Sequence, residues 1–113
     1  MTVNEKLIAA LSPLGLQLFP DMRQALPDEC AVFTYSELPA DSGDDYPEHE
    51  RILLSVHLFC PIEKDSVALR RQIKARIAGA GYTYPSVADL SEQTGQHWVF
   101  EFEDAEAAID GDV

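Results

Sequence analysis

The sequence predicts a small α+β domain with an N-terminal helix, a mostly antiparallel four- to five-stranded sheet built of two hairpins, and a main helix packed on one face. Three observations lead to this fold class. Residues 50–60 carry an apolar side chain at every second position, which indicates a central strand with one fully covered face. Residues 96–103 alternate in the same way. Residues 65–80 repeat apolar side chains at helical spacing and form the main helix.

Length and composition limit the possible architectures. With 113 residues, 46% of them hydrophobic, the chain is long enough for one packed core. We expect a single domain over residues 1–104, with a mobile acidic loop at 39–50 and an acidic tail at 105–113. No apolar run approaches the roughly 18 residues of a membrane span, and no secretory signal is visible, so a cytoplasmic protein is expected.

The chain is strongly acidic. Its 20 acidic and 8 basic residues give a formal net charge of −12, which disfavours binding to nucleic acid because phosphates need Lys and Arg partners. Two interpretations stay open at this point. The acidity either keeps the protein soluble or forms a surface that nucleic acid slides past without adhering.

The N-terminal part of the chain contains one helix and one short strand. The helix covers residues 2–11, begins with a capping box formed by Thr2 and Glu5, and is stopped by Pro13. Residues 16–19 form the short strand. The turn-rich stretch 20–29 predicts a loop with room for one helical turn.

A long hairpin follows this loop. Residues 30–38, rich in β-branched and aromatic side chains, pair with the central strand 50–60. The connection between the two strands carries the carboxylates of Asp41, Asp44, Asp45 and Glu48. Their spacing does not match a calcium-binding loop, so a solvated loop is expected, with ordering against a partner as the alternative.

The second hairpin closes the domain. A weaker strand over residues 82–90, confined to an edge or a bulge by Pro85, precedes the regular strand 96–103. On the regular strand, the side chains expected in the core are Trp98, Phe100 and Phe102. Those expected to face outward are His97, Val99, Glu101 and Glu103.

The main helix carries most of the positive charge. Its buried stripe is predicted to consist of Leu69, Ile73, Ile77 and Ala80. Arg70, Arg71 and Lys74 are predicted to form one contiguous exposed flank, and Arg76 lies at the opposite edge of the stripe. Two interpretations of the flank stay open. It is either a solvated helix face or a surface that binds an acidic partner.

The sequence contains no pattern that predicts an enzyme, a cofactor or a metal. Cys30 and Cys60 match no paired-cysteine motif, so two buried free thiols are expected, although the hairpin can bring them close together. His49, His57 and His97 have no metal-ligand spacing and are expected at the surface, where they would meet only if the hairpins packed with their outer faces adjoining. No nucleophile stands beside a recognisable base.

Four stretches of the chain resemble the tail-terminator and tail-completion proteins of long-tailed bacteriophages and prophages. They are FTYSELP at residues 33–39, VHLFCP at 56–61, RRQIK at 70–74 and GQHWVFE at 95–101. The predicted order of helix, short strand, long hairpin, helix and hairpin is similar as well, and the likeness extends over residues 2–104. The shared features are structural and not catalytic.

The resemblance implies a non-enzymatic protein that forms a ring, commonly hexameric, which caps the tail tube and joins it to the head connector. Its partners would be further copies of itself, tube proteins and connector proteins, with DNA as a passing, unbound strand and no membrane. It would reside in the bacterial cytoplasm and, once assembled, in the virion tail. The candidate subunit interface consists of Arg70, Arg71, Lys74, Arg76, Asp41, Asp44, Asp45 and Glu48.

A different class of protein is the alternative: a monomeric acidic binding module, or a DNA mimic that occupies a basic protein site. A mimic needs carboxylates spaced like phosphates on one rigid face, whereas here many fall in a loop and a tail. That distribution favours the ring-forming protein.

Overall fold

The computed structural model describes residues 3–20, 26–39 and 50–104 of the chain. Along the chain these residues form α1 (Val3–Leu11), the 3-10 turn η1 (Ser12–Leu14), β1 (Leu18–Phe19), β2 (Cys30–Pro39), β3 (Glu50–Cys60), α2 (Val67–Gly79), β4 (Ser86–Asp89) and β5 (Gln96–Asp104).

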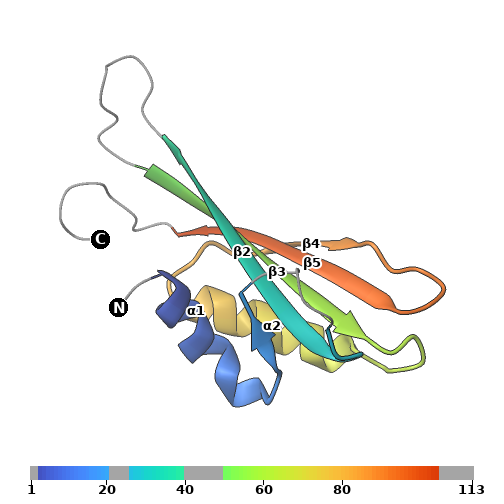
Figure 1. The fold of residues 1–113 in the computed structure, drawn as a ribbon. Helices are drawn as coiled ribbons and strands as arrows, with labels where there is room; N and C mark the ends of the chain where they lie inside the picture. The colour runs from blue at the N-terminus through green and yellow to red at the C-terminus, as the bar shows by residue number, and fades with distance from the viewer. Residues whose placement is uncertain (1–2, 21–25, 40–49, 105–113) are drawn as a thin grey trace.

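The strands form one five-stranded sheet in the order β1-β2-β3-β5-β4. β1 runs parallel to β2, and the other neighbouring pairs are antiparallel. The two hairpins, β2–β3 and β4–β5, lie side by side because β5 returns next to β3 after the chain has passed through α2 (Figure 1). This arrangement confirms the predicted α+β fold with a mostly antiparallel sheet.

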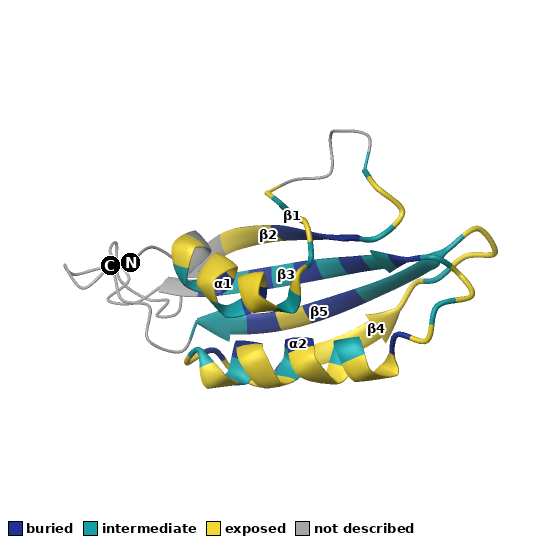
Figure 2. Ribbon diagram, turned by 90° about the horizontal axis from the view of Figure 1, so that it is seen from below, coloured by how far each residue is buried: buried dark blue, intermediate teal, exposed yellow. Residues whose placement is uncertain are grey.

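Both helices cover the same face of the sheet, as Figure 2 shows with α1 and α2 in front of the strands. The core lies between these layers. From β3 it receives the predicted alternate side chains, all at most 4% exposed: Ile52, Leu54, Val56 and Leu58. The helices contribute fully buried side chains from their inner faces: Leu7, Leu11, Ile73 and Ile77. Burying an apolar side chain of this size stabilises the fold by about 1.5–3 kcal/mol relative to leaving it in water.

The element boundaries follow local chemistry. After α1 the chain makes one 3-10 turn that includes Pro13 and ends at Gly15, whose φ of 76° is left-handed and suits glycine. α2 begins at Val67 with Ser66 at the N-cap position, in agreement with the expected start near residues 65–66, and Asp65 Oδ1 accepts a hydrogen bond from the Val67 amide at 3.1 Å. It ends at Gly79, close to the predicted end.

Two strands are shorter than predicted. β1 contains only Leu18 and Phe19, the last half of the expected strand. β4 contains only Ser86–Asp89 and lies at the edge of the sheet, as Pro85 indicated, because proline cannot donate a hydrogen bond to a neighbouring strand. The edge position is therefore confirmed.

Some predictions concern residues outside the described ranges. These are the capping role of Thr2, residues 21–25 of the loop 20–29 that had room for a helical turn, the acidic residues between 40 and 49, and the tail after 104. Within the described part of the chain, no helix is long and apolar enough to cross a membrane.

Candidate subunit interface

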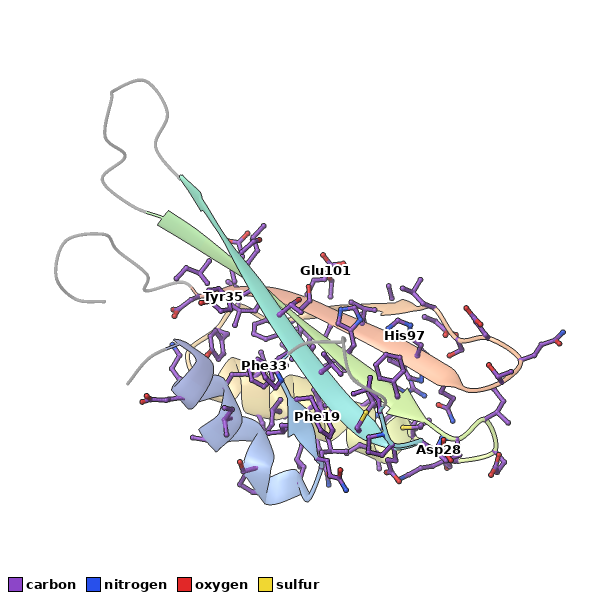
Figure 3. All side chains as sticks on the ribbon, viewed as in Figure 1. Phe19, Asp28, Phe33, Tyr35, His97 and Glu101 are labelled. Carbon is purple, nitrogen blue, oxygen red and sulfur yellow. The ribbon has the colours of Figure 1, made fainter. Side chains whose placement is uncertain are left out.

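The sheet face opposite the helices is the surface that could receive a partner. The strand register places its side chains in rows across the sheet: Cys30–Phe59–His97, Val32–His57–Val99–Ala88 and Thr34–Ser55–Glu101–Ser86. The rows change from aromatic and apolar near the end of β3 to polar toward its start. In Figure 3, Glu101 and Phe33 project to opposite sides of the sheet, with Phe33 toward the helices.

Three small side chains on this uncovered face are nonetheless buried. Cys30 and Val32 are 0% exposed and Val99 is 6% exposed, although both helices lie on the other side. Val99 thus lies on the face away from the helices, as predicted, but it is buried there and does not reach solvent. Val32 and Val99 flank the larger ring of His57 directly across the strands, and side chains in such cross-strand positions pack against each other.

A pair of histidines occupies the middle of this face. His57 Nδ1 and His97 Nε2 lie 2.8 Å apart in a hydrogen bond, and the ring of Phe59 stacks on His97 with 4.4 Å between centroids. Since one imidazole must donate and the other accept, at least one of the two is neutral. The sequence predicted scattered surface histidines, but β3 and β5 are neighbours and bring these two half-buried rings together. His49 lies outside the described residues.

Burial disfavours the charged form of both imidazoles. It lowers the pKa of His57, the nearby His97 lowers it further, and Glu101 opposes the shift. Burial also lowers the pKa of His97, and Glu92 opposes that shift. Among the residues with described positions, no group of three or more His, Cys, Asp or Glu side chains is arranged to hold a metal ion.

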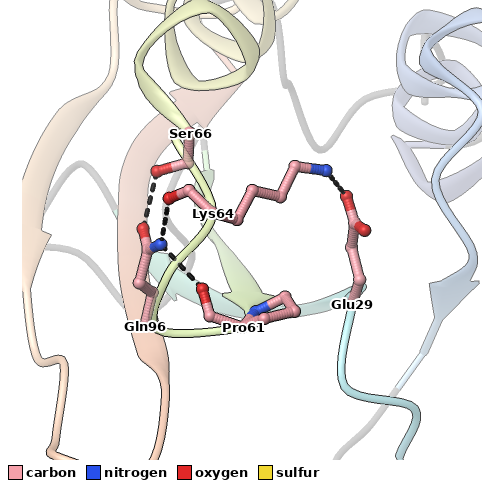
Figure 4. Close-up of polar contacts among 5 residues, drawn as sticks. All are labelled: Glu29, Pro61, Lys64, Ser66 and Gln96. Atoms are coloured by element: carbon pink, nitrogen blue, oxygen red, sulfur yellow. Dashed lines mark hydrogen bonds and ion pairs between the residues drawn. The ribbon is translucent and has the colours of Figure 1, made fainter.

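Gln96 connects the sheet to the start of α2 (Figure 4). Its Nε2 donates hydrogen bonds to the carbonyl oxygens of Pro61, at 2.9 Å, and Lys64, at 2.6 Å. Its Oε1 accepts hydrogen bonds from Ser66 Oγ at 2.7 Å and from Trp98 Nε1 at 2.9 Å. The sequence did not reveal this role, because Gln96 opens an ordinary strand and its backbone partners lie more than 30 residues earlier.

Lys64 forms an ion pair with Glu29 at the same end of the molecule (Figure 4). This pair ties the chain just before β2 to the loop after β3, and the hydrogen bond with Glu29 raises the pKa of Lys64. The Lys64 charge is thus compensated within the chain.

The predicted basic flank of α2 is only partly available to a partner. Arg70 is half-buried, its guanidinium lies 3.8 Å from the centroid of the Trp98 ring, and its Nε donates a hydrogen bond to Ser66 Oγ at 3.0 Å. Arg76 Nη1 donates to the Ala10 carbonyl at 3.5 Å. The prediction of a contiguous exposed flank that includes Arg70 is therefore wrong.

Arg71 and Lys74 make no comparable contacts with the described residues. Arg71 is exposed and Lys74 is partly exposed, and neither makes a side-chain hydrogen bond or an ion pair with the described part of the chain. They are the members of the predicted cationic set whose charges have no partner among the residues with described positions. Asp41, Asp44, Asp45 and Glu48, the predicted acidic members, lie outside the described residues.

A hollow of about 520 Å³ lies where β3 ends and β5 begins. We call it the end hollow and define it by three apolar and three acidic lining residues: Phe59, Ile62, Leu90, Asp28, Glu63 and Glu92. Ile62 and Leu90 are 50% and 54% exposed, and the three carboxylates are exposed as well. The hollow joins the aromatic end of the uncovered face, because Phe59 and His97 both line it.

Both cysteines are free and buried, as expected. Cys30 pairs with Phe59 in the register, and strand alternation places Cys30 on the uncovered face and Cys60 on the covered face. Burial raises the pKa of both thiols, so they stay protonated near neutral pH.

Comparison with known proteins provides no family assignment. No protein-family model matches this chain, and no curated protein matches it.

Proposed function

We propose that this protein is a non-enzymatic structural subunit that assembles into a ring, which terminates the tail tube of a long-tailed phage or prophage and joins it to the head connector. The observation that carries the proposal is the one-sided sheet. Both helices cover one face, and the other face ends in a hollow with exposed apolar and acidic side chains. Such a surface is suited to contact with another subunit.

The charge supports a role near DNA without binding to it. At a net charge of −12, each subunit repels DNA, so a ring of such subunits would let the duplex pass without adhering. The four stretches that resemble tail-terminator proteins support the same role. The subunit would reside in the host cytoplasm before assembly and in the virion tail afterwards.

Ring formation also agrees with an uneven charge distribution. Cations without a partner among the described residues lie on α2, and carboxylates without an ion pair to the described cations line the end hollow, so two different surfaces of one subunit are complementary to each other. A contact between two different surfaces repeats from one subunit to the next and closes into a ring when its rotation fits.

The test is the mass of the purified protein in solution across a concentration series, by light scattering and native mass spectrometry, with electron microscopy of the assembled species. We expect a concentration-dependent shift to one closed oligomer, most simply a hexamer. A monomer at all concentrations would contradict self-assembly and favour the acidic binding module. A pull-down with basic proteins would then test that alternative.

A further inference from the structure

We infer that the end hollow of one copy receives the Arg71 and Lys74 side chains of α2 from a second copy, which makes this contact the repeating interface of the ring. The inference rests on the proposed self-assembly and specifies which surfaces meet.

The cationic surface of the contact is identified by asking which basic side chains already have a partner within the described residues. Lys6 pairs with Asp104 at 3.3 Å, and Lys64 pairs with Glu29. Arg70 and Arg76 contact Trp98 and the Ala10 carbonyl, as described above. Among the cations whose side chains the structure describes, Arg71 and Lys74 alone make no hydrogen bond, ion pair or ring contact within the described residues. They lie three positions apart on α2, so their side chains are neighbours on one helical face.

The acidic side follows from the lining of the hollow. Asp28, Glu63 and Glu92 are exposed, and none of the three carboxylates forms an ion pair with the described cations. Beside them, Ile62 and Leu90 expose half of their surface. A hollow lined by both apolar and acidic side chains suits the side chains of Arg and Lys, whose aliphatic stems pack on apolar surface while their charged ends reach the acids.

A second copy of the chain is the occupant that this charge pattern favours. No described ion pair joins the cations of α2 to the carboxylates of the hollow within one chain. Within the part of the chain that the structure describes, each copy therefore presents one cationic surface and one acidic surface that are not paired with each other. Because the two surfaces differ, the contact is heterologous and leaves one of each free for the next copy, which produces a chain of subunits or a ring.

Two charge-reversed variants test the contact. The hollow variant carries Glu63→Lys and Glu92→Lys, and the helix variant carries Arg71→Glu and Lys74→Glu. Each variant alone places like charges on both surfaces, so we expect its self-association to be at least about tenfold weaker than that of the wild type. A salt titration of the wild type should weaken association as well, because exposed charges are screened.

An equimolar mixture of the two variants provides the decisive measurement. In the mixture each acidic surface finds a basic one, so the oligomer should return with alternating subunits, which native mass spectrometry identifies by the mass difference. Recovery on mixing cannot arise if either variant is unfolded. Glu101→Lys, which reverses a charge on the same sheet face away from the hollow, serves as the matched control and should leave association unchanged.

The outcomes separate this inference from the proposed function. If the wild type forms a closed oligomer and the two variants form it equally well, the inference is wrong and ring formation stands. If each variant is folded and fails to assemble, but the mixture also stays monomeric, the two surfaces do not meet and the inference is wrong. A wild type that stays monomeric at every concentration would contradict both.

Discussion

The two faces of the sheet are built differently. The face under the helices has an apolar centre with the polar side chains of Gln96 and Asp104 at its two ends, and the β3 side chains of that centre are at most 4% exposed. The opposite face contains a histidine pair, an aromatic ring and three buried small side chains, and its polar rows are open to solvent. The first face is stabilised mainly by burial against other elements. The second depends on contacts between side chains of adjacent strands, which are individually weaker.

The largest expected difference between the faces is in the cost of removing an aromatic ring. Phe100 is 0% exposed beneath the helices, so Phe100→Ala should lower the free energy of unfolding by about 3–5 kcal/mol. Phe59 on the uncovered face is half-buried and stacks on His97, so Phe59→Ala should cost about 1 kcal/mol. Urea denaturation at low protein concentration measures both. Equal losses would contradict the distinction between the two faces.

Replacement of Gln96 tests how much the connection between β5 and the start of α2 contributes to stability. Gln96→Ala removes an amide that makes four hydrogen bonds and leaves the carbonyls of Pro61 and Lys64 without this donor. We expect a loss of about 1–3 kcal/mol in unfolding free energy. Gln72→Ala is the matched control, because Gln72 is exposed on α2, and it should have almost no effect. If Gln96→Ala leaves the unfolding free energy unchanged, water replaces the hydrogen bonds of the amide without loss of stability.

Arg70 and Arg71 provide a comparison between two adjacent residues of the same type. Arg70→Ala removes the contact with the Trp98 ring and should lower the unfolding free energy by about 0.5–1 kcal/mol. Arg71→Ala removes an exposed side chain with no described contact and should change the stability of the monomer very little. Denaturation curves of the two variants, measured together, check this order. The reverse order would show that Arg71, and not Arg70, belongs to the folded core.

The smallest effect concerns the pH dependence of the uncovered face. The pKa of His57 is lowered from its ordinary value of 6.5 in the folded protein, so the unfolded chain binds the proton more tightly. The associated stability is present above pH 6.5 and is lost as the pH falls through the lower folded pKa. Unfolding free energies of wild type and His57→Gln should therefore converge as the solution is acidified below that value. Parallel curves would contradict the shift, since the carboxylate background is common to both proteins.

The covered face was predictable because its signal is local. The alternation of Ile52, Leu54, Val56 and Leu58 identified both the strand and its buried side, and Pro85 identified the edge strand. The helical spacing of Ile73 and Ile77 identified the inner side of α2. Each of these patterns depends only on where successive side chains point in a regular element.

The candidate interface was predictable only in part. The sequence located the cations on α2, but it did not reveal that Arg70 is engaged by Trp98, which lies 28 positions further along the chain. It also did not predict the contact of His57 with His97, 40 positions apart, or the burial of Val99. The carboxylates expected to meet the cations fall outside the described residues, and those of the end hollow come from three separate segments.

By itself the sequence determined the type of each element, the acidity of the protein and the face of each strand that is apolar and becomes buried. Tertiary structure decided which residues meet: β5 lies beside β3 and not beside β2, and this neighbourhood creates the histidine pair, the Gln96 connection and the end hollow. The reason is physical. Side-chain direction repeats with the short period of a helix or strand, whereas contacts between distant segments depend on strand order and register, which only the packing of the whole domain determines.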